Sequence, residues 1–484
     1  MNKVSRGPAG LHFRGLVLVL ALGLSGAAIA QSPPAGFVNH GLIGVGRTPA
    51  DTRDKFGETT ISSSGIVADL KAWRRDGDSY LGTIYQLPDR GWNTGGTIDY
   101  RPRLHRLAIA FNPAAPAQRN AVIVTLADTI LLTDANGEPL TGLDPDGMRP
   151  AANGFPDLPR ASNGRISLDP EAVVLLPDGS FFISDEYGPY IFRFSPAGRM
   201  LGAIRPPEAL IPLRKGQQNF SSNNPGPGAS APVPPDPETG RQNNQGFEGL
   251  ALTPDGRTLA VILQSATRQD GGTSAATREH TRMLFYDVSD PARPKLTRHI
   301  VVQLPAFTDD NGRRRIAAQS ELLALDNHRF LLLCRDGGNG YGLETATSRY
   351  RRIELLDTRN ATNLVGTTYE GPTPVAPGGK LVAGITPAAL ASFIDINDNA
   401  QLRRFGLHNG EPNDRNNLSE KWESLALLPA LDPTRPDDFF LFVGNDNDFM
   451  TQHGYQAGAA YKDASGVDID SMFLVYRVTI PPLK

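Results

Sequence analysis

The chain of 484 residues carries 48 Lys and Arg against 51 Asp and Glu, and its formal net charge is −3. This near-neutral balance speaks against a nucleic-acid-binding protein and against attachment to an anionic membrane through a basic surface. Cys334 is the only cysteine, so no intrachain disulfide can form and the fold must be stabilised by its hydrophobic core.

The first thirty residues have the pattern of a cleavable export signal. A positively charged start precedes an apolar stretch, residues 16–24, and the small residues Ala28-Ile29-Ala30 follow it. We expect residues 1–30 to be a signal peptide and residues 31–484 to be the mature domain. The apolar stretch is shorter than the roughly 20 residues of a membrane-spanning helix. The sequence therefore predicts a periplasmic or secreted protein with no membrane attachment after the signal is removed.

A repeated motif runs through the mature chain. Each copy has a Glu, a short apolar segment, a turn and a second apolar segment that ends in polar residues, and four clear copies open at Glu171, Glu248, Glu321 and Glu423. In the clearest two copies the turn reads Pro-Asp-Gly, which is typical of a hairpin. A weaker first copy begins at Ser64 and ends at Asp89-Arg90-Gly91.

Two further strands are expected after each copy, so the repeats predict an all-β protein, a single β-propeller of four-stranded blades. Five blades can be counted, and a sixth would have to come from the poorly patterned regions 133–165 or 375–410. The last blade lacks a fourth strand after Val478, and we expect residues 40–46 to supply it and close the ring. Residues 215–244 are rich in Pro, Gly and Asn and are expected to form a flexible insertion.

The spacing within the copies predicts where their polar residues gather. The opening Glu and the polar residue after the second strand are 14 residues apart in Glu171 to Asp185 and 15 apart in Glu321 to Asp336. Two short strands and a tight turn fill that distance and return the chain to the end where it began. Because the innermost strand of a blade lines the axis, we expect these side chains to converge on one mouth of the central channel.

Converging carboxylates without a His or Cys cluster favour a hard cation, and Ca²⁺ accepts six to eight oxygen ligands. The expected metal ligands are Asp89, Glu171, Asp185, Glu248, Glu321, Glu423 and Asp446. Arg90, Arg335 and Lys421 stand next to the acidic motifs, where they can bind phosphate oxygens. The alternative is a purely structural ring of ion pairs in which the arginines neutralise neighbouring carboxylates.

Several short motifs occur together in one known family. They are Asp89-Arg90-Gly91, Asp169-Pro170-Glu171, Ser184-Asp185-Glu186-Tyr187-Gly188-Pro189, Gly246-Phe247-Glu248-Gly249-Leu250, Ser320-Glu321-Leu322-Leu323, Arg335-Asp336-Gly337 and Asn445-Asp446-Asn447-Asp448. Together they resemble the phytase-like family of exported proteins, which is named for an esterase-like activity of phytase. The resemblance extends from about Ser64 to about Val478. The sequence departs from the family pattern at Gln245, Cys334 and Ser424, where the family usually has Arg, Glu and Gly.

The resemblance implies a hydrolase of phosphoric esters whose repeated acidic residues form the active site. The expected catalytic residues are Arg90, Glu248, Glu321, Arg335 and Asp336. We expect a monomeric, Ca²⁺-dependent enzyme with a small-molecule substrate such as a phosphate ester. Two alternatives stay open: a non-enzymatic propeller that binds a small ligand or a partner protein, and a lactonase-type esterase in which a bound Ca²⁺ polarises a carbonyl group.

Overall fold

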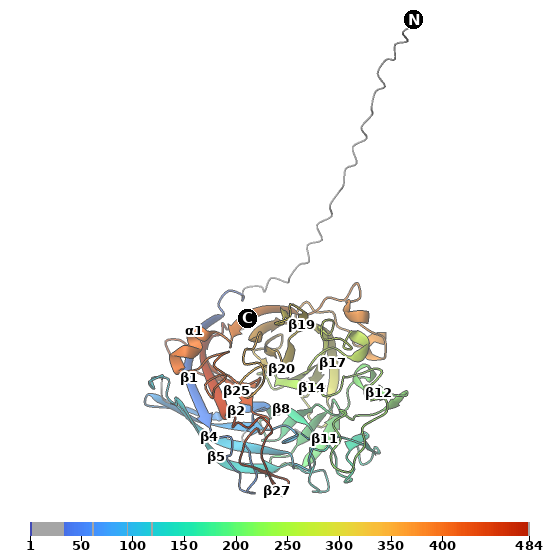
Figure 1. Cartoon of the computed structure of the whole chain (residues 1–484), viewed down its shortest axis with the longest axis horizontal. Helices are drawn as coiled ribbons and strands as arrows, with labels where there is room; N and C mark the ends of the chain where they lie inside the picture. The colour runs from blue at the N-terminus through green and yellow to red at the C-terminus, as the bar shows by residue number, and fades with distance from the viewer. Residues whose placement is uncertain (2–32, 61, 94, 118–119, 483–484) are drawn as a thin grey trace.

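The computed structural model describes Met1 and residues 33–60, 62–93, 95–117 and 120–482, so the expected signal peptide, apart from Met1, lies outside the described residues. In this part of the chain, strand pairing forms five four-stranded antiparallel sheets and not a sixth. The sheets are arranged as blades around a common centre (Figure 1). The fold is a five-bladed β-propeller, as the repeats predict.

The blades follow one another in chain order, and in blades 1 to 4 the first strand is the innermost. Blade 1 contains β2 (Gly65–Asp76), β3 (Ser79–Leu87), β4 (Arg103–Phe111) and β5 (Val122–Leu131). Blade 2 contains β8 (Pro170–Leu175), β9 (Phe181–Asp185), β10 (Ile191–Phe194) and β11 (Met200–Ile204). Blade 3 contains β14 (Phe247–Leu252), β15 (Thr258–Leu263), β16 (His280–Asp287) and β17 (Lys295–Gln303). Blade 4 contains β20 (Ala318–Ala324), β21 (Arg329–Arg335), β22 (Arg351–Asp357) and β23 (Ala389–Asp395).

Blade 5 joins the two ends of the chain. It contains β24 (Lys421–Pro429), β25 (Asp438–Asp446), β28 (Ser471–Thr479) and, as its outermost strand, β1 (Val38–Thr48). In the β1–β28 pair, Val45 lies opposite Leu474 and Gly46 opposite Phe473. The prediction that residues 40–46 close the ring is therefore confirmed. The innermost strands also form a closed circle, because β2 contacts both β8 and β24, and β14 and β20 complete the circuit.

The close fit of β1 against blade 1 yields a test of ring closure. A Cβ added at Gly46 would lie 2.7 Å from the carbonyl oxygen of Val122 on β5. We expect Gly46→Ala to lower the free energy of unfolding by about 1–3 kcal/mol, because backbone on both sides must shift. Gly202→Ala is the matched control on the outer strand β11, where a Cβ meets nothing within 4 Å. Equal unfolding free energies of the two variants, measured by denaturant titration, would contradict this packing.

The hydrophobic core lies between the blades. Among the described residues, each pair of adjacent blades shares a buried cluster, and that between blades 1 and 5 is rich in aromatic side chains. There Trp73 stacks on Tyr80 with ring centroids 5.3 Å apart, and Phe440 meets Tyr80 edge to face at 4.9 Å. Because the second strand of blade 4 is covered on both faces by its neighbouring blades, the long apolar run of residues 330–333 becomes a buried strand.

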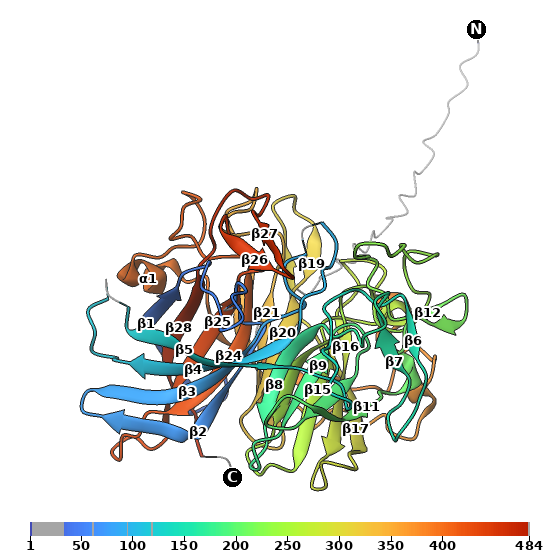
Figure 2. The ribbon, with the colours of Figure 1, turned by 90° about the horizontal axis from the view of Figure 1, so that it is seen from below.

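Most of the additional elements lie on the connections that enter the innermost strands. The hairpins are β6 (Gly147–Arg149) with β7 (Leu158–Arg160), β12 (Leu213–Arg214) with β13 (Gln217–Gln218), β18 (Ala306–Thr308) with β19 (Arg314–Ile316) and β26 (Gly454–Gln456) with β27 (Ala459–Tyr461). The helices are α1 (Asn399–Leu402), η1 (Glu208–Leu210), η2 (Arg268–Asp270), η3 (Thr368–Glu370), η4 (Pro377–Gly379) and η5 (Arg403–Phe405). Figure 2 shows β12, β19, β26, β27 and α1 towards one face of the ring. The innermost strands begin at the face that carries these insertions, which we call the mouth.

The two regions considered for a sixth blade have other roles. Residues 133–165 contain the β6–β7 hairpin, and residues 375–410 contain β23, the outer strand of blade 4, together with short helices. The insertion 215–244 lies between blades 2 and 3 and is hydrogen-bonded at several points. Asp144 accepts the backbone N–H groups of Ser222 and Asn224, at 2.6 and 3.0 Å.

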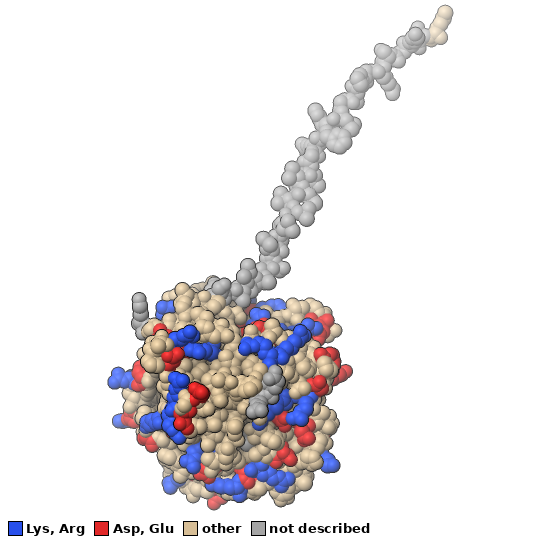
Figure 3. All heavy atoms as spheres, turned by 90° about the vertical axis from the view of Figure 1, so that its left-hand side faces the viewer, with Lys and Arg blue, Asp and Glu red and all other residues tan. Residues whose placement is uncertain are grey.

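Charges of both signs are spread over the surface. On the face drawn in Figure 3, basic and acidic side chains are interspersed. None of the helices in the described ranges is long and apolar enough to cross a membrane.

Candidate functional site

The four repeated glutamates lie at the beginning of the innermost strands. Glu171, Glu248, Glu321 and Glu423 belong to β8, β14, β20 and β24 and are 3–6% exposed. In each blade the pairing between the first and second strands shifts at this glutamate. Such β-bulges re-aim a side chain. Because the innermost strands form a closed circle, these glutamates lie around the mouth, and burial together with the charges of Glu248 and Glu423 raises the pKa of Glu171.

Blade 2 contributes a compact acidic group. Carboxylate oxygens of Asp169, Glu171 and Glu186 lie within 4.8 Å of one another. Arg90 compensates part of this charge, with Nη1 2.6 Å from Asp169 Oδ2 and 4.0 Å from Glu186 Oε2. Glu171 accepts no hydrogen bond from any described residue, and Glu186 Oε1 is buried without a described partner. We call these three carboxylates the blade 2 triad.

A second acidic group joins blades 1 and 5. Oxygens of Asp89, Asp446 and Asp448 lie within 4.8 Å of one another. Lys421 Nζ is 2.6 Å from Asp448 Oδ1 and 3.8 Å from Asp446 Oδ2. Asp446 also accepts hydrogen bonds from the hydroxyl groups of two serines, Ser62 and Ser64, on the connection into β2. We call these three carboxylates the blade 5 triad.

The remaining predicted glutamates lie between these groups. Glu423 is paired with Arg335 Nη2, and Arg335 Nε donates to Ser320 Oγ at 3.0 Å. Glu248 Oε1 accepts the side-chain amide of Gln264, whereas Glu248 Oε2 is buried and has no hydrogen-bond partner in the described structure.

The carboxylates of three predicted residues accept hydrogen bonds from backbone N–H groups. Asp185 accepts the N–H groups of Asp169, Tyr187 and Gly188 at 2.8–3.1 Å, so it fixes the start of β8 and the loop after β9. Asp336 accepts the N–H of Arg349 at 2.6 Å and the hydroxyl of Ser348 at 2.7 Å, and it closes the loop between β21 and β22. Glu321 Oε1 accepts the N–H of Leu322 at 2.7 Å.

Burial makes this face costly to ionise. Desolvation, followed by repulsion from neighbouring carboxylates, raises the pKa of Glu171 and Glu248 well above the usual range. Burial raises the pKa of Asp169 to about 7 although Arg90 opposes the rise. Burial likewise raises the pKa of Glu423 to about 7 against the effect of Arg335. The mouth therefore holds more carboxyl groups than its own cations can keep ionised.

Access to the mouth is greatest beside the blade 5 triad. The side chains of Glu420, Lys421 and Asp448 are 24%, 24% and 29% exposed, whereas the predicted glutamates are almost fully buried. These three residues line a small cleft whose other wall contains the apolar side chains of Met450 and Ile469.

Sequence reasoning did not include Asp169, Glu186 and Asp448 among the site residues. Each of them stands one or two positions from a predicted residue, in Asp169-Pro170-Glu171, Asp185-Glu186 and Asp446-Asn447-Asp448. Asp169 immediately precedes β8, which begins at Pro170, so the alternation of side chains along the strand gives no signal for it. Glu186 and Asp448 lie beyond strand ends, where alternation does not apply.

The three departures from the family pattern have different surroundings. Cys334 is fully buried in the apolar cluster between blades 3 and 4, next to Arg335 but on the opposite face of β21. The substitution therefore removes no carboxylate from the mouth. Gln245 Oε1 accepts the side-chain amide of Gln242 at 2.8 Å, so its side chain is held within the insertion that precedes β14. Ser424 is completely buried behind Glu423.

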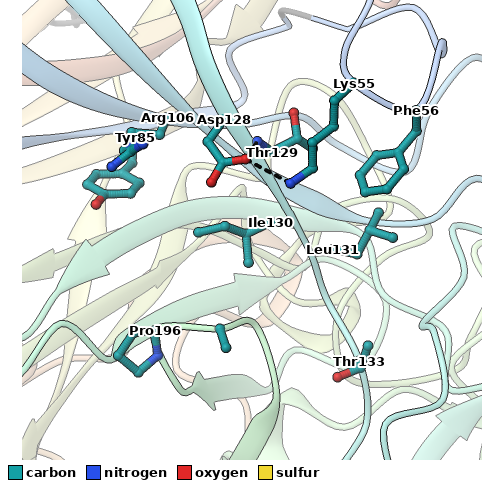
Figure 4. A pocket seen from close by; sticks show the side chains of 11 residues that line it. Lys55, Phe56, Tyr85, Arg106, Asp128, Thr129, Ile130, Leu131, Thr133 and Pro196 are labelled. Atoms are coloured by element: carbon teal, nitrogen blue, oxygen red, sulfur yellow. Dashed lines mark hydrogen bonds and ion pairs between the residues drawn. The ribbon is translucent and has the colours of Figure 1, made fainter.

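A separate hollow of about 620 Å³ opens on the outer side of blades 1 and 2 (Figure 4). Its wall includes β5 and the turn at Pro196, and Lys55 Nζ pairs with Asp128 Oδ1 across it at 2.8 Å. This pair neutralises itself, and the lining brings no carboxylates together. The mouth remains the better candidate site.

Known proteins resemble the chain over most of its length. The family model Phytase-like, described as esterase-like activity of phytase, matches residues 75–449. An uncharacterized secreted protein of Arthroderma benhamiae is 40% identical over 458 residues, which cover 86% of this chain and 88% of that protein.

Solved structures are more distant. A luciferin-regenerating enzyme has 10% identity and a TM-score of 0.30, with 92% of this chain and 95% of that chain covered. A putative 6-phosphogluconolactonase of Bacteroides fragilis has 9% identity and a TM-score of 0.25, with 84% and 83% covered. The propeller fold is shown by the strand pairing described above. The family is shown by the family model and by the 40% identical relative, which agree with the motifs at the mouth. The chain belongs to the phytase-like family.

Proposed function

We propose that the protein is an exported, Ca²⁺-dependent hydrolase of phosphoric esters that acts at the acidic mouth. The observation that carries the proposal is the pair of buried carboxylate oxygens, Glu186 Oε1 and Glu248 Oε2, for which the described residues supply no hydrogen-bond donor. A buried charge without a partner is strongly destabilising. A cation that binds between these oxygens removes that cost.

The chain's own cations indicate where the ion would bind. Arg90 forms an ion pair with Asp169, Arg335 forms one with Glu423, and Lys421 lies within the blade 5 triad. Glu186 and Glu248 each keep a buried oxygen without a described partner, Glu171 lies within the blade 2 triad beside Glu186, and all their ligand atoms are oxygens, which suits Ca²⁺. We therefore assign Glu171, Glu186 and Glu248 as the residues that would hold the ion.

The remaining residues take roles that follow from their contacts. When bound, a Ca²⁺ ion would supply a Lewis acid that draws charge from a phosphoryl oxygen. Arg90 and Arg335 would contact the other phosphoryl oxygens, and the buried Arg90 Nε, which has no described partner, supports this role for Arg90. Asp169, whose pKa is about 7, is suited to accept a proton from an attacking water near neutral pH.

Glu321 and Asp336 are better described as positioning residues. Both use their carboxylates to hold backbone, Glu321 at the start of β20 and Asp336 in the loop that follows Arg335. Their effect on hydrolysis would therefore be exerted through the placement of Glu423 and Arg335.

Export and substrate size are parts of the same proposal. The N-terminal sequence pattern supports export, and so does the relative described as secreted. The narrow access beside Lys421 favours a small-molecule ester, and we expect the protein to act as a monomer.

A substrate panel tests this proposal. The mature protein, treated with a chelator, should fail to hydrolyse a phosphomonoester and should regain the activity when Ca²⁺ is added. A phosphodiester and a lactone belong in the same panel. Chelator-sensitive hydrolysis of the lactone alone would replace our proposal with a lactonase-type esterase. Cation binding without hydrolysis of any substrate would favour a propeller that binds a ligand or a partner protein.

A further inference from the structure

The two acidic triads differ in how they are neutralised. Both bring three carboxylate oxygens within 4.8 Å of one another. In the blade 2 triad the chain's cation is Arg90, which lies at the edge, 2.6 Å from Asp169 and 4.0 Å from Glu186. In the blade 5 triad the cation is Lys421, whose ammonium group carries the same unit charge in a much smaller volume.

The position of Lys421 is fixed by the fold. Lys421 lies directly opposite Asp446 in the β24–β25 pair, so the register of blade 5 places both residues at the mouth. Its Nζ is 2.6 Å from Asp448 and 3.8 Å from Asp446. The neighbouring Asp89 is 4% exposed, and no described residue donates a hydrogen bond to its Oδ2. Asp89 Oδ2, which accepts no hydrogen bond from a described residue, favours a cation within this triad, and the ammonium group of Lys421 already lies there.

We infer that the ammonium group of Lys421 fills a second cation position at the mouth and prevents a divalent ion from binding there. A divalent ion placed among the same three carboxylates would meet the positive charge at a distance of a few ångströms, which is strongly unfavourable in a partly buried site. The protein therefore holds one exchangeable divalent ion and one permanent cation of its own.

This arrangement deepens the proposed function. Lys421 lines the small cleft beside the blade 5 triad. A phosphate ester entering the mouth meets the ammonium group first, and two of its three N–H donors remain after the contact with Asp448. The inference rests on the proposed function for the ion held by Glu171, Glu186 and Glu248, but the occupancy of the blade 5 triad can be tested separately.

Replacing Lys421 by methionine tests the inference. Methionine keeps the unbranched chain and removes the charge, so the blade 5 triad should become free to bind an ion. After equilibrium dialysis against Ca²⁺, metal analysis should find one more ion per chain in Lys421→Met than in the wild type. Lys55→Met is the matched control, because Lys55 also pairs with an aspartate at 2.8 Å but lies at the surface, away from the triads. The control should bind as many ions as the wild type.

Asp448→Asn, with Lys421 intact, decides the question even if Lys421→Met does not fold. We expect this variant to keep the wild-type number of ions, with an affinity changed by less than about threefold. Loss of an ion from Asp448→Asn would place the divalent ion in the blade 5 triad and overturn the inference. An unchanged ion count in folded Lys421→Met would overturn it as well. This test compares the number of bound ions in each variant with that in the wild type. The proposed function has a different test, because it fails if the wild type binds no Ca²⁺ or hydrolyses no ester.

Discussion

Replacing Glu248 by glutamine should lower the affinity of the protein for Ca²⁺ by at least about 100-fold and reduce ester hydrolysis by a similar factor. Glutamine has nearly the same shape and can still bind the amide of Gln264, so the change removes one charge with little disturbance of packing. Calorimetric titration of the chelator-treated protein with Ca²⁺ measures the affinity, and release of phosphate measures the activity.

The same substitution should have the opposite effect on the metal-free protein. Without an ion, Glu248 Oε2 is a buried oxygen with no described partner, and repulsion from Glu186 adds to the cost of ionising Glu248. Removing this charge should raise the melting temperature of the metal-free protein at pH 8. In saturating Ca²⁺ the order should reverse, because an ion that binds only the native state stabilises the wild type more.

Glu354→Gln is the control for this prediction. Glu354 is also buried, at 3% exposure, but it lies on the third strand of blade 4 and accepts a hydrogen bond from Tyr350 Oη at 2.6 Å. Its replacement should leave Ca²⁺ affinity and hydrolysis unchanged. If Glu248→Gln bound Ca²⁺ as tightly as the wild type, the assignment of the ion to Glu171, Glu186 and Glu248 would be wrong.

The metal-free protein should become less stable as the pH rises from about 4.5 to 8. In the folded state burial raises the pKa of Asp169 and of Glu423 to about 7, whereas both carboxylates titrate near pH 4 in the unfolded chain. Within this window the folded state binds more protons than the unfolded state, so the free energy of unfolding falls as the pH increases. Carboxylates whose pKa is lowered, such as Asp128, are ionised throughout and do not reverse the trend.

Melting curves of the chelator-treated protein measure this effect. One pKa unit corresponds to about 1.4 kcal/mol, so a loss of a few kcal/mol and a fall of about 5 °C or more in melting temperature are expected between pH 5 and pH 8. Added Ca²⁺ should recover the loss at pH 8 and have little effect at pH 5, where protons occupy the carboxylates. A melting temperature that is constant or rises over this range without metal would contradict the electrostatics of the mouth.

Much of the fold could be predicted because the repeated motif determines the first two strands of each blade. The Glu, the apolar segment and the Pro-Asp-Gly turn specify the first two strands of a blade, and the missing partner of β28 specifies the role of β1. The contents of residues 133–165 and 375–410 could not be predicted, because strands of three residues such as β6 and β7 are too short to show a period. The contacts of these segments are set by the blades on which they pack.

The sequence predicted the convergence of the repeated glutamates, because the two strands and the turn of each copy return the chain to the end where it began. It did not predict how the charges divide among them. Glu423 pairs with Arg335, which lies 88 positions earlier in another blade. Lys421 lies opposite Asp446, 25 positions later on the neighbouring strand. The spacing from the repeated Glu to the polar residue after the second strand reveals neither contact. Glu186 was missed for a similar reason, since it joins the blade 2 triad through a loop.

Hydrolysis should depend on one divalent ion held at the mouth. The most direct test measures the release of phosphate from a phosphomonoester while the chelator-treated mature protein is titrated with Ca²⁺, with Glu248→Gln measured in parallel. We predict no release without Ca²⁺, an increase that ends at one ion per wild-type chain, and no increase for the variant over the same range. Release that is independent of Ca²⁺, or equal in the wild type and the variant, would contradict the claim.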